Sequence, residues 1–321
     1  MYRRSLIRSA AAAGLLPSAA RAQSFPSRQL RLLVGAAAGG GADIVARILA
    51  QELTKDGGLS VMVDNRPGAG GTLATREMLR APADGYTLLV ANVGVLAIIP
   101  YATKDAGYDP RADIVPVCLA VDFSNLLVVH PGVPARTLAE YLALARRPDG
   151  MDYGTSGVGS AGHLAGELLK ALSGARLNHV PFRGGGPAMN DLVGGHVPSL
   201  IASAPTATGV MREGRIRVLA ATGARRSPFD PDIPTIAEQG FPGYAATNWY
   251  AVVVSSKTPP EIVTTLNAIL TKALGAPEVR TAYGQQGMET LASTADEAAS
   301  HIARETEIWK KVIANAGIRL E

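Results

Sequence analysis

The sequence is poor in the residues that most often carry chemistry. Its 321 residues include one cysteine, five histidines and two tryptophans, and only 18% of them are charged. The lone Cys118 cannot form an internal disulfide, so cysteine usage neither supports nor excludes an oxidising compartment. No histidine pair has a metal-ligand spacing such as H-E-x-x-H, and the Walker lysine motif and the G-x-S-x-G elbow are missing. We therefore predict no catalytic residues, no metal and no cofactor, an inventory that suits binding more than catalysis.

Acidic residues are missing from the first 22 positions, which hold four arginines. Without those arginines, 27 of the 31 basic residues remain, and the chain has 27 acidic residues. The remaining chain is therefore neutral, and it contains no basic run that would bind a phosphate backbone. A nucleic-acid partner is excluded on this ground.

Residues 1–22 have the form of a secretory signal peptide. A basic start is followed by an apolar middle and by Ala20-Arg21-Ala22, a small-x-small cleavage site. The apolar part is too short to span a bilayer, although an uncleaved anchor is the alternative. The Arg3-Arg4 pair is compatible with twin-arginine export as well as with general secretion. We expect cleavage after Ala22 and a periplasmic protein.

Glycine, by contrast, is abundant, and four glycine-rich loops each join an apolar strand to an amphipathic helix. The loops are GAAAGGGAD after LRLLV, RPGAGG after VMVDN, TSGVGSAG after MDYG, and RGGG after the strand that ends at Phe182. Strands alternating with helices predict mainly parallel sheets with helices on both faces. In such sheets ligands bind beyond the carboxyl ends of the strands, where these loops lie.

Two further apolar strands, Leu126–Pro131 and Asn248–Ser255, separate the pairs of units and predict two chain crossings between lobes. We expect an α/β fold with two lobes, each built on a mainly parallel doubly wound sheet, and a cleft between them. Residues 1–22 are assigned to the signal peptide, 23–123 plus 251–321 to lobe 1, and 124–250 to lobe 2. The crossings are the expected hinges.

Of the four loops, the fourth has the strongest sequence evidence for an anion site. Gly184-Gly185-Gly186 precede Pro187, which suits the first turn of a helix, so unpaired N–H groups face an approaching ligand. The planar fork of Arg183 would suit a carboxylate, and a solvated surface arginine is the alternative. GVGSAG, residues 157–162, matches a dinucleotide fingerprint, but Arg183 stands in the region where that fingerprint needs an acid, which disfavours this interpretation.

Four other residues have two interpretations each. Asp43 is read first as a structural residue at a helix start and second as a ligand contact. His163 opens a helix and bonds either the backbone or the ligand. Trp249 and Tyr250 are read as packed hinge aromatics, with a place on the cleft wall as the alternative.

Taken together, these segments resemble the substrate-binding proteins of tripartite tricarboxylate transporters, the Bug family. The matching segments follow the family order and cover nearly the whole chain after the signal peptide: AGGGADIVAR (38–47), NRPGAGG (65–71), ADGYTLL (83–89), YGTSGVGSAGHLAGE (153–167), HVPFRGGGPAMNDLVGGHV (179–197) and IPTIAEQGFPGY (233–244). The resemblance implies a type II periplasmic binding protein fold whose two lobes close on a small carboxylate.

The resemblance also implies that loop N–H groups, hydroxyls and water hold the ligand. Carried over to this sequence, the implied ligand-binding residues are Gly39, Gly40, Gly41, Asp43, Gly70, Gly71, Ser156, Gly157, Gly159, Ser160, His163, Arg183, Gly184, Gly185, Gly186 and Ala188. The chain departs from the family at Gly35-Ala36-Ala37, Ala42, Val95 and SLIASAP (199–205). These departures predict a pocket that is less polar on one side.

We therefore expect a secreted solute-binding protein, not an enzyme, that acts as a monomer. Its expected partners are a small carboxylate (a di- or tricarboxylate, an amino acid or an aromatic acid) and the membrane permease subunits of a tripartite transporter. Two alternatives stay open at this point: an exported enzyme acting on a carboxylate, and a binding protein that signals to a receptor instead of serving a transporter.

Overall fold

The structure is a computed structural model that describes residues 25–56 and 58–315. The predicted signal peptide lies outside the described residues. Within those ranges, no helix is both long enough and apolar enough to cross a membrane.

Within residues 25–56 and 58–315, ten strands form one hydrogen-bonded sheet. They are β1 (Leu30–Val34), β2 (Val61–Asn65), β3 (Thr87–Asn92), β4 (Ile114–Val129), β5 (Met151–Thr155), β6 (Leu177–Pro181), β7 (Ser199–Ser203), β8 (Arg217–Ala221), β9 (Thr247–Ser255) and β10 (Glu289–Thr290). Their order is β2-β1-β3-β9-β4-β7-β5-β6, with β8 and β10 also paired to β4. The predicted strands LRLLV and VMVDN are β1 and β2, with the same bounds.

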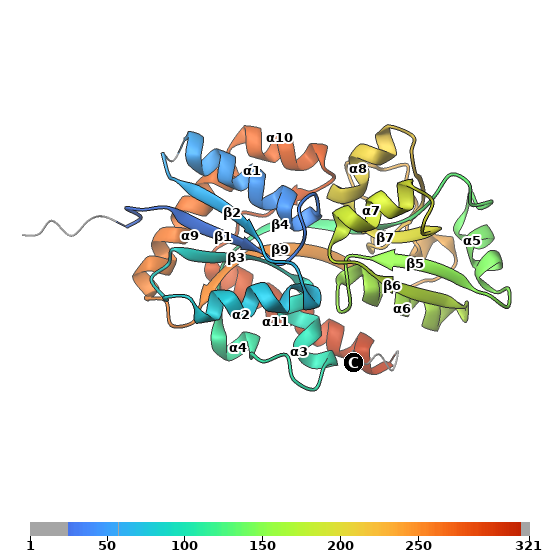
Figure 1. Ribbon diagram of the computed structural model, residues 1–321, viewed down its shortest axis with the longest axis horizontal. Helices are drawn as coiled ribbons and strands as arrows, with labels where there is room; N and C mark the ends of the chain where they lie inside the picture. Colours follow the sequence, from blue (N-terminus) through green and yellow to red (C-terminus); the bar gives the residue numbers. More distant parts are fainter. Residues whose placement is uncertain (1–24, 57, 316–321) are drawn as a thin grey trace, which may run out of the picture.

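The sheet is continuous because the two halves of one long strand, β4, pair with different neighbours. From Ile114 to Ser124, β4 pairs antiparallel with β9, and from Asn125 to Val129 it pairs antiparallel with β7. The parallel strands β1, β2 and β3 form a first strand group, and the parallel strands β5, β6 and β7 form a second. The expectation of two separate, mainly parallel sheets was therefore wrong: β4 and β9 join both groups into one mixed sheet (Figure 1).

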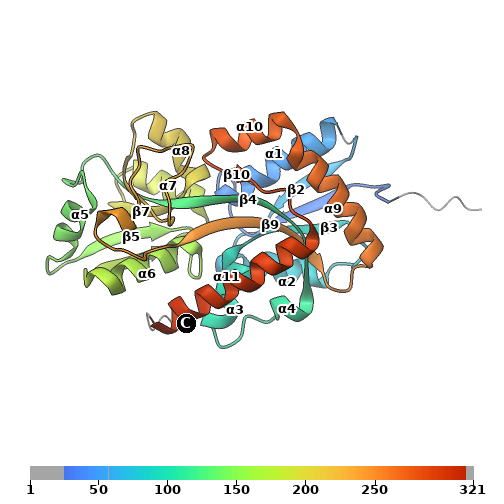
Figure 2. The same ribbon diagram turned by 180° about the vertical axis from the view of Figure 1, so that it is seen from behind.

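Helices cover both faces of the sheet. They are α1 (Gly41–Lys55), α2 (Thr72–Arg80), α3 (Ile99–Ala102), α4 (Pro110–Asp113), α5 (Leu138–Ala145), α6 (Ala161–Ser173), α7 (Gly185–Val193), α8 (Ala204–Arg212), α9 (Pro260–Gly275), α10 (Pro277–Gln285) and α11 (Ala295–Asn315), with short turns η1 (Ala69–Gly71), η2 (Gly94–Ile98) and η3 (Ala237–Gln239). Figure 2 shows α11 running obliquely across the back of the molecule, where it packs against β4. All four predicted strand–loop–helix units are present: β1–α1, β2–α2, β5–α6 and β6–α7.

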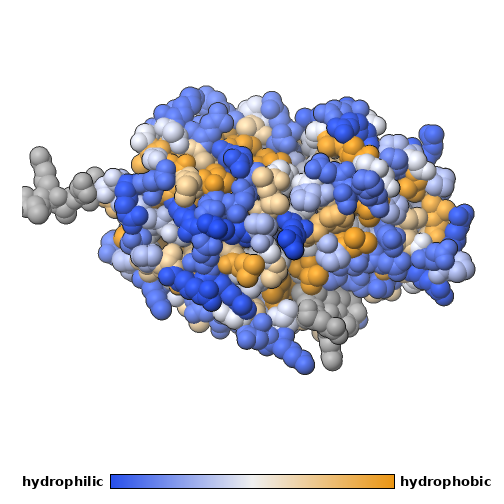
Figure 3. All heavy atoms as spheres, in the orientation of Figure 1, coloured by the Kyte–Doolittle hydropathy of each residue, from blue (hydrophilic) through white to orange (hydrophobic). Residues whose placement is uncertain are grey.

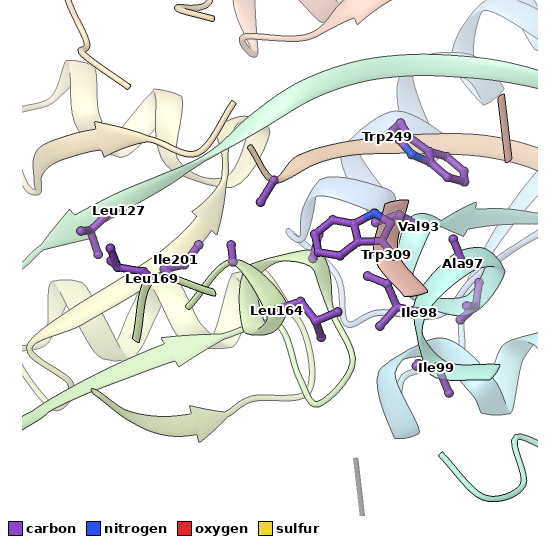
Figure 4. Close-up of a cluster of buried hydrophobic side chains, with 14 of the residues drawn as sticks. Val93, Ala97, Ile98, Ile99, Leu127, Leu164, Leu169, Ile201, Trp249 and Trp309 are labelled. Atoms are coloured by element: carbon purple, nitrogen blue, oxygen red, sulfur yellow. The ribbon is translucent and has the colours of Figure 1, made fainter. Parts of the chain in front are cut away.

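A hydrophobic core lies on each face of the sheet. Successive residues of β9 alternate between the two cores, with Trp249 and Ala251 in one and Tyr250 and Val252 in the other. Figure 4 shows that one core continues from Leu127 and other side chains near the second strand group to Trp249 and the η2 segment. On the face seen in Figure 3, apolar residues are interspersed with hydrophilic ones, an arrangement that is ordinary for a folded chain.

Candidate ligand-binding site

A small cavity is lined by residues of both strand groups and of the two strands that join them. Its lining residues are Gly35, Ala36, Gly41, Ala42, Gly70, Asn92, Asn125, Thr155, Ser156, Gly162, Gly185, Ala188, Leu200, Ile201, Ala202, Ser203, Asn248 and Tyr250. About 40 Å³ of it is open to the centres of water molecules. One water needs about 10–15 Å³ on this measure, so the cavity has room for only a few.

The cavity lining contains no charged side chain. Its polar groups are the amides of three asparagines, the hydroxyls of Thr155, Ser156, Ser203 and Tyr250, and the backbone of the glycine loops. Burial raises the pKa of Tyr250 far above its usual range, so its hydroxyl stays protonated. Neutral hydrogen-bonding groups are therefore the means by which this cavity can hold an anion.

Four helices begin at the cavity. Gly41 of α1, Gly162 of α6, Gly185 of α7 and Ser203, which precedes α8, all line it. The residues that precede α1, α7 and α8 make no side-chain cap to their helix, so first-turn N–H groups remain for a ligand. Each helix start also carries part of a positive dipole charge. This convergence gives the cavity a positive potential without any cationic side chain.

Glycine loops of the two strand groups touch backbone to backbone beside the cavity. The N–H of Ala37, in the loop before α1, donates to the carbonyl of Arg183, in the loop before α7, at 3.2 Å. A β-carbon added at Gly70 would lie 2.5 Å from the carbonyl oxygen of Val158, and one added at Gly186 would lie 2.6 Å from that of Ala38. Because real β-carbons do not come so close, glycine is required at these contacts. We call the 37–40 and 183–186 contact the glycine seam.

The structure brings the predicted site residues into one region but gives them different positions. Five line the cavity: Gly41, Gly70, Ser156, Gly185 and Ala188. Gly39, Gly40, Gly184 and Gly186 lie in the glycine seam. Gly71, Gly157, Gly159 and Ser160 belong to the neighbouring loops without lining the cavity, and Ser160 caps α6 by accepting from the N–H of His163 at 3.2 Å.

Asp43 holds the loop before α1. Its side chain is 3% exposed, and its Oδ2 accepts from the N–H of Gly39 and from Nε of Arg47, both at 2.9 Å. Burial alone would raise the pKa of Asp43, but the bonds to Arg47 and Gly39, together with Asn65 and the charge of Arg47, lower that pKa below its ordinary value. Asp43 is not among the cavity residues, and its ligand contact stays a prediction.

Two stacked histidines form hydrogen bonds with the end of β5 and with the loop between β5 and α6. The rings of His163 and His179 stack with centroids 3.8 Å apart, and His163 Nδ1 accepts from the N–H of Gly159 at 3.2 Å. His179 Nε2 lies 2.6 Å from the hydroxyl of Thr155, a cavity residue. Burial lowers the pKa of both rings, so the pair is neutral at pH 7. His163 thus bonds the backbone, the first of its two interpretations.

The side chain of Arg183 is exposed and does not line the cavity. Its backbone carbonyl takes part in the glycine seam instead. The ligand contact expected for its guanidinium stays a prediction, and its position favours the alternative of a solvated arginine.

Sequence reasoning missed the polar residues on the joining strands. Asn125 and Asn248 lie at the ends of apolar runs that were read only as crossings, and Ser203 lies in SLIASAP. Both aromatics are packed in a core, and Tyr250 also lines the cavity whereas Trp249 does not. A polar amide at the edge of a buried apolar strand is the signal that could have found the asparagines.

A family model described as the tripartite tricarboxylate transporter family receptor, TctC, matches residues 45–318. The chain belongs to this family. Its fold matches solved structures: Rpa4515 of R. palustris with adipate, 36% identical over 92% of this chain and 99% of that one, with a TM-score of 0.88; and the periplasmic binding protein BugD, 30% identical over 92% and 100%, with a TM-score of 0.88. MatC of Rhodopseudomonas palustris, with bound malate, is 31% identical over 90% and 100%, with a TM-score of 0.85.

As a member of the TctC receptor family, the protein is a solute receptor with the α/β fold of periplasmic binding proteins. This confirms the family that the sequence motifs indicated. The family is one of transport receptors, which bind rather than convert their ligands, so the alternative of an exported enzyme is set aside.

Proposed function

We propose that this receptor captures a small carboxylate in the periplasm for the permease subunits of a tripartite transporter. The observation that carries the proposal is the convergence of four helix starts on a cavity with no charged side chain. Such a site stabilises a carboxylate through N–H groups, hydroxyls and helix dipoles. The adipate in Rpa4515 and the malate in MatC support this ligand class.

We also propose that the chain works as two lobes, residues 23–123 plus 251–321 and residues 124–250. The change of partner in β4 at Asn125, from β9 to β7, supports a hinge at that point. The small cavity supports a closed state in which the loops meet, because a ligand of several carbon atoms needs them apart to enter. The bound carboxylate would favour the closed state by touching both lobes.

Isothermal titration calorimetry tests the ligand class. We expect purified receptor to bind at least one of adipate, succinate, malate, citrate and benzoate, and to lose that binding when the carboxylate is converted to a methyl ester. The ester removes the negative charge that the helix dipoles favour while keeping the carbon skeleton. A receptor that binds the ester as well as the acid would contradict the proposal.

Export is proposed to remove residues 1–22. The acid-free basic start and the Ala20-Arg21-Ala22 site support cleavage after Ala22. Amino-terminal sequencing of the protein from its own cell envelope should read Gln23 first. A chain that still began at Met1 would contradict both the cleavage and the proposed export of a monomeric receptor to the periplasm.

A further inference from the structure

Two asparagines in the cavity keep hydrogen-bonding atoms without partners. Asn125 of β4 is 1% exposed and Asn248 of β9 is 7% exposed. Asn248 Nδ2 donates to Asn125 Oδ1 at 3.1 Å. Asn125 Nδ2 and Asn248 Oδ1 are buried and have no partner among the described residues. We call these two residues the amide pair. Unpaired buried amide atoms are costly, so a group that pairs with both of them would bind favourably here.

The amide pair offers the same chemistry whichever way its amides point. Turning both amides by half a rotation exchanges the nitrogen and oxygen positions, so that Asn125 would donate to Asn248. One NH₂ and one carbonyl oxygen then remain unpaired, as before. The pair therefore always has one unpaired donor and one unpaired acceptor, on two residues that line the cavity.

Both residues of the amide pair are held in place at the point where the sheet changes partners. The N–H of Asn125 donates to the hydroxyl of Thr222 at 3.1 Å, and the carbonyl of Asn125 accepts from the N–H of Thr222 at 2.9 Å. Asn248 is fixed by its pairing with Phe123 across β4 and β9. With both backbones fixed and the two amides bonded to each other, the pair discriminates between ligands because either orientation leaves one donor and one acceptor unpaired.

We propose that the amide pair selects ligands whose second polar group is both a hydrogen-bond donor and an acceptor, such as a hydroxyl or a carboxamide. This inference rests on the proposed function, in which the glycine loops hold the first group, a carboxylate. A second carboxylate accepts only, and its oxygen would face the carbonyl of the pair. An ammonium donates only, and it would face the NH₂ of the pair with no anionic side chain in the lining to balance its charge.

Ligands matched in carbon skeleton test the proposal by calorimetry. Succinate, 4-hydroxybutanoate, succinamate and 4-aminobutanoate share four carbons and one carboxylate and differ only in the group at the other end, and adipate and adipamate share six carbons. In the wild-type receptor we expect the hydroxyl or carboxamide member of a series to bind at least about tenfold more tightly than the plain dicarboxylate, and than 4-aminobutanoate in the four-carbon series. 4-Hydroxybutanoate and succinamate separate the hydroxyl from the carboxamide. Equal affinities within a series would overturn the inference and leave the proposed function intact.

A variant identifies the residues responsible. Asn248→Leu removes one amide of the pair and releases the Asn125 amide from its hydrogen bond, so the paired arrangement of one donor and one acceptor is lost. The preference should then fall to within about threefold, mainly by weakening the hydroxyl or carboxamide ligand. Asn190→Leu, at an exposed position on α7, is the matched control and should keep the wild-type preference. An unchanged preference in folded Asn248→Leu would overturn the assignment to the pair. If Asn248→Leu does not fold, the wild-type ratios alone decide, and binding of no member of either series would contradict the proposed function itself.

Discussion

Replacing Gly186 by valine is expected to abolish ligand binding while the chain still folds. Gly186 lies in the first turn of α7, and its φ is not in the left-handed region, so its backbone conformation accepts a side chain. An added β-carbon, however, would lie 2.6 Å from the carbonyl oxygen of Ala38 and 3.2 Å from the carbonyl carbon of Gly39. Both are backbone atoms of the other side of the glycine seam, which cannot rotate away as a flexible side chain would.

The substitution should impair closure of the two lobes, because the added side chain clashes only when the two loops touch. A ligand shifts the equilibrium between open and closed forms only through better contacts in the closed form. With the seam blocked, we expect at least a 100-fold loss of affinity, about 2.7 kcal/mol of binding free energy. Small-angle scattering should show compaction of the wild-type receptor with a saturating carboxylate and none for Gly186→Val.

Gly209→Val is the matched control for this variant. Gly209 also lies in a helix, α8, and an added β-carbon there would meet no atom within 4 Å. This control should bind and compact like the wild type. If Gly186→Val binds with wild-type affinity and compacts, the glycine seam does not form on closure and the two-lobe proposal loses its main support.

The local units of the fold could be predicted from sequence because their signals are local. The apolar runs LRLLV and VMVDN, each read as a strand before a glycine-rich loop, have the bounds of β1 and β2. Pro187 marked the first turn of α7, where a missing N–H has no cost. The same glycines located the loops of the site, since they are needed where backbones approach closely.

The continuous sheet could not be predicted because it depends on one strand with a mixed pattern. We expected a strand only from Leu126, whereas β4 begins at Ile114 and includes Pro116 and the polar residues Asp122 and Ser124. Near Pro116 the register with β9 shifts, which accommodates a residue without a backbone N–H. Pairing between β4 and β9 is a long-range property that no local periodicity reveals.

The polar lining of the cavity was missed for a related reason. Asn125 and Asn248 are separated by 123 positions in the chain and meet only through the pairing of β4 with β9. Each alone looks like an ordinary amide beside an apolar run. Arg183 was predicted to contact the ligand; its side chain is exposed and does not line the cavity, and the contact stays a prediction. Chemistry that depends on side-chain direction needs the fold.

Acidification below pH 6.5 is expected to destabilise the protein through His179. Burial, and to a smaller extent the neighbouring His163 and Lys170, together lower the pKa of His179 to about 3. Tyr153 packs on the His179 ring, and its hydroxyl donates to Glu167 at 2.8 Å, so that carboxylate is already engaged. Protonating one ring of the stacked pair would place a cation in a buried site against its partner.

The sign follows from the proton count of each state. Between pH 6.5 and about pH 3 an unfolded His179 is protonated and a folded one is not, so the unfolded state binds more protons. The stability that this residue contributes is complete above pH 6.5 and is lost as the pH falls. The loss is about 1.4 kcal/mol per pH unit, or about 2 kcal/mol between pH 6.5 and pH 5.

Urea unfolding of three proteins at pH 7 and pH 5 measures this loss. His179→Gln keeps a donor near the hydroxyl of Thr155 but cannot be protonated, so we expect it to lose about 2 kcal/mol less than the wild type on acidification. His196→Gln changes a histidine with an exposed side chain and should behave like the wild type. If all three proteins lose the same free energy of unfolding, His179 is not held neutral by its surroundings. The ring beside the hydroxyl of Thr155 would then tolerate a positive charge in the folded protein.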